Sequence, residues 1–447
     1  MAGGTFDASV GKVRPGTYIN TKSSKTNTSG SNLRGIVVIP LLNHKWGPKG
    51  EFITLNASAP DASITKLGFS VYDNDANMIM IKEALKNATT VIVYIPSAGA
   101  KATGAAAPLT VTAKYGGTRG NSIKFTVVAN PLGGFDVTIY LGTAVVGEYT
   151  GVTTVAQLIA AGNDYVTFSG NGNLVATAGV TLSTGTDVAP TVSDLTTFLD
   201  ALEKVKFNVV AFPIDPESAD AGSLNTALIS KIKYFREQVG KYVKAVVANY
   251  DTDYEGVINL TNAVEVDGSA LSIQQTTAWV AGAEAAATYV QSNTYKKYVG
   301  ATGIVGVKTH EEAIAAINNG EYFFSYSEEG DVVVEYDINS LTSFTTEKTK
   351  DYSKNRVLRV YDTFSDTLKL NFPPNKYDNN DTGWNIMEGI GKGILKDFED
   401  AGAVTEVDYD NDFLVDRSKS SGDQTYFNIG IKAVDSSEKL YFTVTTR

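Results

Sequence analysis

Apolar and polar residues follow each other in the early part of the chain in a pattern that predicts buried strands and helices. Residues 33–42 (LRGIVVIPLL) form an apolar run closed by a proline, which is typical of a buried strand. Residues 73–96 predict a short helix followed by a strand over Val91–Ile95. Strands that alternate with helices indicate a mostly parallel sheet covered on both faces. We therefore expect an α/β layer to begin here.

The same alternation returns after residue 188. Ser193 is the predicted N-cap of a helix over 193–205, because a serine side chain can accept a hydrogen bond from a free amide at a helix start. The last helix predicted in this part is rich in small residues, which allow close approach by a flat neighbour such as a sheet. The further predicted elements are the strand 207–213, the helix 223–239, the strands 242–249 and 256–260, and the small-residue helix 272–291.

Between about residues 97 and 188 the composition changes to Thr, Val, Gly and Ala, and charged residues become rare. Short alternating segments are separated by glycine or Asn-Pro in this region. Several short strands at such spacing indicate a β-sandwich. Residues 154–162 predict one helix within it. We interpret this region as a domain inserted into the α/β core.

The last third of the chain has an α+β pattern. Residues 310–339 predict a helix and then a hairpin that turns at Glu328-Glu329-Gly330, and a third section starts at 354–372. Residues 383–402 predict its helix, and residues 438–447 predict a strand. We therefore expect an α/β and α+β multidomain protein.

Short predicted strands lie near both ends of the chain. Residues 17–19 form one, and the twelve residues that follow, 21–32, include no apolar residue. The other is LYFTV, residues 440–444. An isolated strand leaves its backbone donors and acceptors without partners. Each strand must therefore pair with its own sheet or with a sheet of another chain.

These patterns divide the chain into six segments. The expected segments are an N-terminal arm (1–32), the first part of the α/β core (33–97), an inserted β-sandwich domain (98–188), the rest of the core (189–345), a C-terminal α+β domain (346–436) and a C-terminal strand arm (437–447).

Composition narrows the class of protein. The 447 residues are 43% hydrophobic and include no cysteine, which excludes disulfides, cysteine-ligated metals and thiol nucleophiles. The net charge of -11 argues against nucleic acid as a partner. The first residues lack the basic start and apolar core of a signal peptide. No run approaches the roughly 18 apolar residues of a membrane span, so we expect no direct membrane insertion.

Motifs that could carry chemistry are weak. His44 lies in a predicted loop and His310 at a predicted helix start, and surface or capping roles are expected for both. Asp408, Asp410 and Asp412 have the spacing of a calcium loop, but the glycine and glutamate that such a loop needs are missing, so a charged turn is expected. We expect no catalytic residue, no cofactor and no metal site.

The sequence has three Gly-Lys pairs, the dipeptide that phosphate-binding loops contain: Gly11-Lys12, Gly240-Lys241 and Gly391-Lys392. None has a glycine five residues earlier or a serine or threonine after the lysine, so none fits that loop. The segment GIGKG, residues 389–393, does not follow a predicted strand, and its third glycine is misplaced for a dinucleotide-binding turn.

Several segments together resemble one family: the tail sheath proteins of contractile phage tails, phage-tail-like bacteriocins and related injection machines. The start MAGGTF and the length look most like the sheaths of Gram-positive phages and their defective relatives. The resemblance is carried, in this order along the chain, by residues 12–20 (KVRPGTYIN), 113–125 (AKYGGTRGNSIKF), 207–213 (FNVVAFP), 276–286 (TTAWVAGAEAA), 332–345 (VVVEYDINSLTSFT) and 354–364 (KNRVLRVYDTF).

The resemblance implies that both arms leave the subunit and join a sheet in neighbouring subunits, which knits stacked hexameric rings into a mesh. It also implies that the C-terminal domain contacts an inner tube through a helix. Residues 387–402 fit that helix, and Lys392 and Lys396 lie at i, i+4 on one face, where they would meet acidic groups or only solvent. The matching arm residues are Thr17, Tyr18, Ile19, Asn20, Leu440, Tyr441, Phe442, Thr443 and Val444.

The function that this resemblance implies is a structural polymer that contracts from a metastable extended state and drives the tube through a bacterial envelope. Its partners would be copies of itself, the tail tube protein, and baseplate and tail terminator proteins. It would assemble in the bacterial cytoplasm and end in an extracellular particle. Two alternatives remain open: a surface-layer or adhesin-like protein, and a cytosolic enzyme on a doubly wound sheet. The missing signal peptide argues against the first, and the missing site argues against the second.

Overall fold

The computed structural model describes residues 34–446. From Arg34 onward the chain forms one compact unit. The predicted N-terminal strand residues, Thr17 to Asn20, lie outside the described residues.

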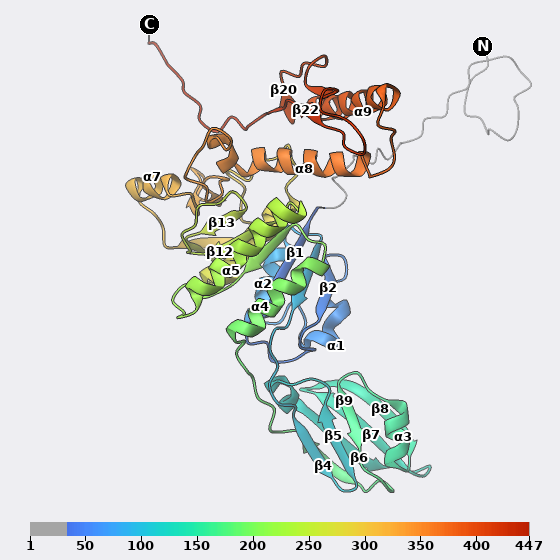
Figure 1. The fold of residues 1–447 in the computed structure, drawn as a ribbon. Coiled ribbons are helices and arrows are strands. Elements are labelled where there is room, and N and C mark those ends of the chain that lie inside the picture. The colour runs from blue at the N-terminus through green and yellow to red at the C-terminus, as the bar shows by residue number, and fades with distance from the viewer. Residues whose placement is uncertain (1–33, 447) are drawn as a thin grey trace, which may run out of the picture. The chain divides into compact units, whose positions relative to one another are not determined.

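A seven-stranded sheet forms the centre of the fold (Figure 1). All neighbouring strands run parallel except β2, which runs antiparallel to β3 at one edge. This confirms the predicted mostly parallel sheet. From one edge to the other, the strands are β17 (Glu321–Tyr322), β13 (Val257–Leu260), β12 (Lys244–Ala248), β11 (Val209–Phe212), β1 (Ile36–Pro40), β3 (Thr90–Tyr94) and β2 (Phe52–Asn56).

Helices cover both faces of this sheet. Because alternate residues of a strand point to opposite sides, each central strand contributes side chains to two separate cores. Val37 and Ile39 of β1 share a core with α2 (Ala76–Leu85) and α6 (Ile273–Ala286). Val38 belongs instead to the core under α4 (Val192–Ala201) and α5 (Ala221–Lys233). Both cores are built from fully buried aliphatic and aromatic side chains.

Small residues on α6 bring two helices into close contact. A Cβ added to Gly282 would lie 2.5 Å from the carbonyl oxygen of Ala84 in α2, so no larger residue fits there. The other side of α6 packs on the sheet strands β11 and β12. The small-residue helix therefore approaches a sheet, as predicted, and also a second helix.

Two predicted helix boundaries are wrong. Helix α4 begins at Val192, and its N-cap is Thr191 rather than Ser193. Thr191 accepts from the amide of Asp194, whose carboxylate accepts from the Thr191 amide, and this reciprocal box stabilises a start two residues earlier. Helix α6 ends at Ala286 rather than 291, because Ala287 has extended backbone angles.

The inserted region is a β-sandwich, as predicted (Figure 1). Its two antiparallel sheets enclose a common core of buried side chains. The predicted helix is present as α3 (Val155–Ala161), with a capping box between Thr154 and Gln157. One sheet has β10 (Thr177–Thr181), β6 (Ile123–Ala129), β7 (Phe135–Leu141) and β8 (Ala144–Val152); the other has β4 (Thr103–Ala106), β5 (Leu109–Ala113) and β9 (Val166–Ser169).

Smaller elements complete the core. The predicted hairpin is formed by β18 (Phe324–Tyr326) and β19 (Val332–Val334), which enclose the predicted turn. The sequence pattern missed a three-stranded sheet of β15 (Ser269–Ala270), β14 (Ala263–Val266) and β16 (Ala301–Val305). The other short elements are η2 (Pro60–Ser63), α1 (Ile64–Leu67), η3 (Thr118–Ser122), η4 (Leu202–Lys204), the π-helical turn η5 (Tyr234–Val239), α7 (His310–Asn318) and η6 (Lys350–Ser353).

The C-terminal region pairs two long helices with short strands. Helices α8 (Asn355–Asn371) and α9 (Asp381–Asp400) share an apolar core. The predicted strand over 438–447 makes no ladder within this single chain: residues 438–446 pair with no strand of the described part. The short ladders are β20 (Val404–Thr405) with β23 (Lys432–Ala433), and β21 (Phe413–Val415) with β22 (Phe427–Ile429).

Candidate interaction sites

The C-terminal arm exposes a row of large apolar side chains. The exposed fractions are 64% for Leu440, 90% for Tyr441, 83% for Phe442 and 85% for Val444. Thr443, between the last two, is also exposed. These residues have the β-forming character expected of a strand, and the rest of the described chain does not cover them. An uncovered apolar segment of this kind marks a site for another protein surface.

The two lysines predicted to contact a tube both lie on α9. Lys396 is exposed and forms an ion pair with Asp400 on the same helix, with 3.0 Å between nitrogen and oxygen. The hydrogen bond and charge of Asp400 raise the pKa of Lys396. Lys392 is half-buried one turn earlier. The structure thus gives Lys396 a partner within its own helix, and contact with a tube stays a prediction.

Neither histidine, His44 or His310, lies in a group of side chains suited to bind a metal ion within the described residues. His44 is buried, which corrects the expected surface or capping role, and burial lowers its pKa. Its Nε2 lies 2.9 Å from the carbonyl oxygen of Leu67. His310 is exposed at the first position of α7. Between residues 34 and 446, no three His, Cys, Asp or Glu side chains are grouped to hold a metal ion.

The predicted charged turn at residues 408–412 is held by hydrogen bonds between its own aspartate side chains and its own backbone amides. The amide of Asp408 donates to the Asp412 carboxylate at 2.6 Å, and the amide of Asp410 donates to Asp408 at 2.9 Å. These carboxylates therefore bind backbone amides of the turn, as aspartates in turns commonly do.

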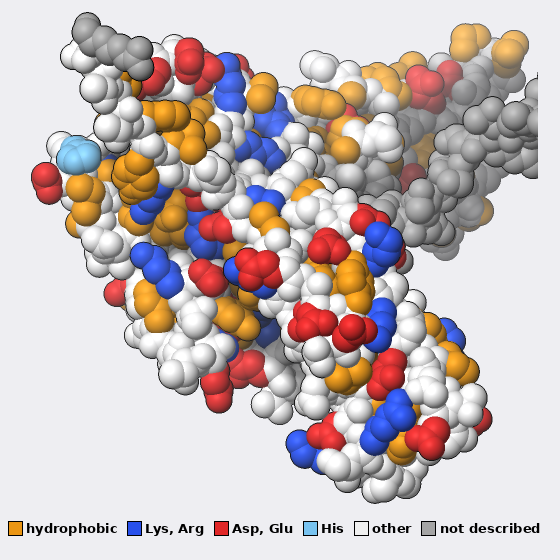
Figure 2. All heavy atoms as spheres, turned by 90° about the horizontal axis from the view of Figure 1, so that it is seen from above, with side chains coloured by type: hydrophobic (Ala, Val, Ile, Leu, Met, Phe, Trp, Pro, Cys, Tyr) orange, Lys and Arg blue, Asp and Glu red, His pale blue; other side chains and the backbone are white. Residues whose placement is uncertain are grey.

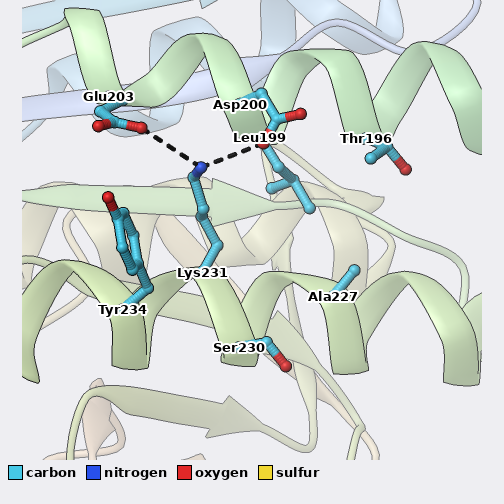
Figure 3. A pocket seen from close by; sticks show the side chains of 8 residues that line it. All are labelled: Thr196, Leu199, Asp200, Glu203, Ala227, Ser230, Lys231 and Tyr234. Atoms are coloured by element: carbon cyan, nitrogen blue, oxygen red, sulfur yellow. Dashed lines mark hydrogen bonds and ion pairs between the residues drawn. The ribbon is translucent and has the colours of Figure 1, made fainter. Parts of the chain in front are cut away.

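A groove between α4 and α5 has a volume of about 430 Å³ (Figure 3). Lys231 of α5 extends across it toward Asp200 and Glu203, at 3.1 and 3.7 Å. The amine of Lys231 therefore forms ion pairs with two carboxylates from the other side of the groove. The residues that line it are Thr196, Leu199, Asp200, Glu203, Ala227, Ser230, Lys231 and Tyr234. They include neither a histidine nor a nucleophile with an adjacent base, so the groove does not have the arrangement of a hydrolytic site.

A buried ionic network joins the core to α8, and the sequence analysis missed it. Lys244, the first residue of β12, donates to Glu284 of α6 at 2.8 Å. Arg359 of α8 donates to the second oxygen of Glu284 and, at 2.9 Å, to Asp337. Their side chains are at most 3% exposed. Burial alone would raise the pKa of Asp337, but Arg359, the Asn293 amide and Lys244 together outweigh it and the pKa is lowered.

A second buried ion pair links α8 to the turn after α5. The Arg236 guanidinium donates through two nitrogens to the two oxygens of Asp362, at 3.0 and 2.7 Å. Burial disfavours the charge of Arg236, but Asp362, with Tyr254 and Glu255, outweighs burial and raises the pKa of the guanidinium. A bidentate pair of this kind fixes orientation as well as distance. Together with the network around Arg359, it attaches α8 to the core at a second place.

An ion pair also ties together the two parts of the core that flank the inserted sandwich. Lys49, before β2, lies 2.9 Å from Asp194 of α4. The Thr191 amide first, then Lys49 and the Thr191 hydroxyl, lower the pKa of Asp194 to about 2. Because the folded-state pKa lies below the ordinary 3.8, this carboxylate stabilises the fold above about pH 4, and the contribution is lost as the pH falls through about 2.

We expect Asp194→Asn to lower stability by about 0.3–1 kcal/mol at pH 7, since a charge near a helix N-terminus is removed. The melting temperature of the wild type should fall more steeply between pH 4 and pH 2 than that of the variant. Scanning calorimetry at pH steps from 5 to 2 measures this, with the exposed Asp423→Asn as the control. Parallel curves for the wild type and Asp194→Asn would contradict it.

The charges on the visible surface are mixed. Figure 2 shows lysine and arginine side chains interspersed with aspartate and glutamate over the face that it presents. That face therefore has neither the continuous basic patch of a phosphate-binding surface nor charges of a single sign.

No helix of residues 34–446 is long and apolar enough to cross a membrane.

Comparisons with known proteins agree along the whole chain. Residues 97–187 match the phage tail sheath protein β-sandwich domain, residues 189–340 the phage tail sheath protein central domain, and residues 347–447 the phage tail sheath C-terminal domain. The phage-like element PBSX protein XkdK of Bacillus subtilis (strain 168) is 34% identical, with 99% of each chain covered.

Solved structures have the same fold. A crystal structure of the sheath tail protein of Desulfitobacterium hafniense is 37% identical, with a TM-score of 0.84 over 96% of this chain and 99% of that one. A chain of the contracted helical sheath of the anti-feeding prophage shares the fold at 13% identity, with a TM-score of 0.56 over 98% of this chain and all of that one (100%). The three domain matches, the Bacillus relative and the Desulfitobacterium structure together show that this chain belongs to the phage tail sheath family, whose members are structural proteins.

Proposed function

We propose that this chain is the subunit of a contractile sheath that polymerises as stacked hexameric rings around an inner tube. The observation that carries the proposal is the exposed row of apolar residues at Leu440–Val444 in a protein of the sheath family. This segment has strand-forming residues without a strand partner in its own chain. Pairing with a sheet of a second copy would satisfy its backbone and cover its side chains. The N-terminal arm, with Thr17 to Asn20, is proposed to act in the same way.

Contraction would use free energy stored in the lattice. In this proposal the extended sheath is metastable, and a baseplate signal releases it into a wider, shorter lattice with more contact between subunits. The two ion-paired attachments of α8 support movement of the body as one piece, because breaking a buried ion pair is costly. Two packings of one polymer then form the bistable element, and no nucleotide hydrolysis is needed.

The proposed partners are other copies of this chain, the tail tube protein, and baseplate and tail terminator proteins. Helix α9 is proposed to face the tube, with Lys392 and Lys396 toward acidic groups; the ion pair of Lys396 with Asp400 would have to open for that contact. Assembly in the bacterial cytoplasm and release in an extracellular particle complete the proposal. We propose, too, that the chain is divided into the six segments expected from its sequence.

The experiment that tests this function is negative-stain electron microscopy of three purified proteins: the full chain, a variant lacking residues 1–20 and a variant lacking residues 440–447. We expect tubes or stacked rings from the full chain at high concentration and single particles from both truncated variants. Circular dichroism melting serves as the control that the bodies remain folded.

Tubes from a truncated variant would remove that arm from the proposal and keep the sheath function. Single particles from the full chain at every concentration, also after addition of tube protein, would contradict the sheath function itself. Turnover of a substrate by the folded monomer would then favour an enzyme.

A further inference from the structure

Glu438 makes more polar contacts with the body than any other residue at the root of the C-terminal arm. Ser292 and Thr294 donate their hydroxyl hydrogens to Glu438 Oε1, at 2.9 and 2.7 Å. Lys354 donates to Oε2 and forms an ion pair with it. The side chains of Lys354 and Glu438 are each only 8% exposed. Three donors from two distant parts of the chain thus bind both oxygens of one carboxylate.

Neighbouring contacts fix the chain just before and after Glu438. Lys354 also lies 3.5 Å from Asp435, and the Arg356 guanidinium donates to the Ser436 hydroxyl at 2.8 Å. The Lys439 amine lies 5.8 Å from the centre of the Tyr336 ring. After Lys439, the arm's side chains are exposed as far as residue 446. The arm therefore has a held root, residues 435–439, and a free part that begins at Leu440.

The root connects to the buried ionic network. Thr294, which donates to Glu438, accepts through the same oxygen from the amide of Asp337 at 2.9 Å. Asp337 in turn accepts from Arg359 at 2.9 Å and from the Asn355 side chain at 3.0 Å. Polar contacts thus run without a gap from the arm root to α8 and to the central sheet strand that begins at Lys244.

We propose that Glu438 is the anchor of an assembly strand: it fixes the root of the arm and presents the docking strand, residues 440–447, to a second copy of this chain. The proposal rests on the sheath function proposed above. Eight residues span at most about 26–29 Å when extended, so the anchor limits the docking strand to a short radius around its root. A second copy held within that radius meets the strand at a raised effective concentration.

The anchor also reduces the cost of docking. A strand whose root is already fixed loses less conformational freedom on binding than one that leaves the body at an earlier residue. Without Glu438, the residues after Ser436 would join the free part, and the longer, looser tether would lower the effective concentration. Force on the docked strand would then extend the freed residues before it was transmitted to the body. Glu438 is thus a positioning residue for assembly.

The test uses Glu438→Gln and Glu438→Ala in the full chain. Gln keeps the size and one acceptor oxygen but loses the ion pair with Lys354, and Ala removes every contact. We expect the protein concentration needed for polymer formation to rise about tenfold with Ala and less with Gln. Sedimentation and electron microscopy measure it. Glu347→Gln, an exposed glutamate in the same region of the sequence, is the matched control.

A second measurement follows the arm directly. Because the protein has no cysteine, Ser437→Cys and Val444→Cys each provide a single site for a nitroxide label. In free subunits we expect an immobile label at residue 437 and a mobile one at 444. Glu438→Ala should make the label at 437 mobile, while the melting temperature and circular dichroism show that the body remains folded.

The outcomes separate the two proposals. If loss of residues 440–447 prevents polymer formation but Glu438→Ala assembles like the wild type, the anchor is overturned and the sheath function stands. A label at residue 437 that stays immobile in Glu438→Ala also overturns the anchor. If the variant without residues 440–447 still assembles, the docking strand itself is wrong. Should the Ala variant fail to fold, the isosteric Gln variant decides by the same two measurements.

Discussion

Arg359→Ala should lower the free energy of unfolding by about 3–5 kcal/mol, because it leaves Glu284 and Asp337 charged and buried without their shared partner. Lys244 would remain beside Glu284 but does not reach Asp337. Urea denaturation followed by circular dichroism measures the loss. A protein of this size can also unfold in more than one step, so the transition that includes α8 is the one to compare.

The matched control is Arg417→Ala. Arg417 pairs with Glu388 and Asp381 on the surface, where about half of its side chain is exposed, so its loss should cost no more than about 1 kcal/mol. Arg359→Met combined with Asp337→Asn should recover part of the stability, since Glu284 keeps Lys244 as its partner and no unpaired acid remains at position 337. Equal effects of Arg359→Ala and Arg417→Ala would show that the network does not hold α8 to the core.

The second large effect concerns the middle glycine of GIGKG. A Cβ added to Gly391 would lie 2.1 Å from ring carbons of Phe413, which is buried and packed against the rings of Phe372 and Phe427. Gly391→Ala should therefore cost about 1–3 kcal/mol through overpacking, although alanine favours helix by about 1 kcal/mol. The melting temperature of the C-terminal helices reports the change.

The same segment offers its own controls. No atom lies within 4 Å of a Cβ added to Gly389 or to Gly393, and both are exposed on α9. Gly389→Ala and Gly393→Ala should each stabilise the protein by about 0.5–1 kcal/mol, because only helix propensity changes. If Gly391→Ala were as stable as these two, the close packing of α9 on Phe413 would be wrong.

Much of the fold could be predicted from the sequence because its signal is local. The strands β1, β11 and β12 are buried on both faces and therefore read as continuous apolar runs. The sandwich was visible from alternation between turn residues. The cap of α4 was misplaced by two residues because Thr191 and Ser193 are equally good caps by type, and only the reciprocal bonds with Asp194 decide.

The contacts that hold the candidate site together have no such local signal. Glu438 and Ser292 are 146 positions apart, and Arg359 and Glu284 are 75 apart. One hint was available: Glu284 is a single charge within a helix of small and apolar residues, which predicts a buried partner. His44 was misjudged for a similar reason, since its burial depends on contacts distant in sequence, among them the one between its Nε2 and the carbonyl oxygen of Leu67. The proposed pairing of the arms involves a second chain, so its contacts cannot be found in the structure of one chain.

The exposed residues at 440–446 carry a cost for the free subunit. LYFTVTT is uncharged, contains no proline and is rich in β-forming residues, which is the composition of segments that stack into amyloid-like cross-β fibrils. Positive charges, Lys439 and Arg447, stand at both of its ends. In a parallel, in-register stack each would lie against the same charge on the next chain, so these two residues act as gatekeepers. These charges thus oppose fibril formation by the segment that is proposed to dock on a neighbouring subunit.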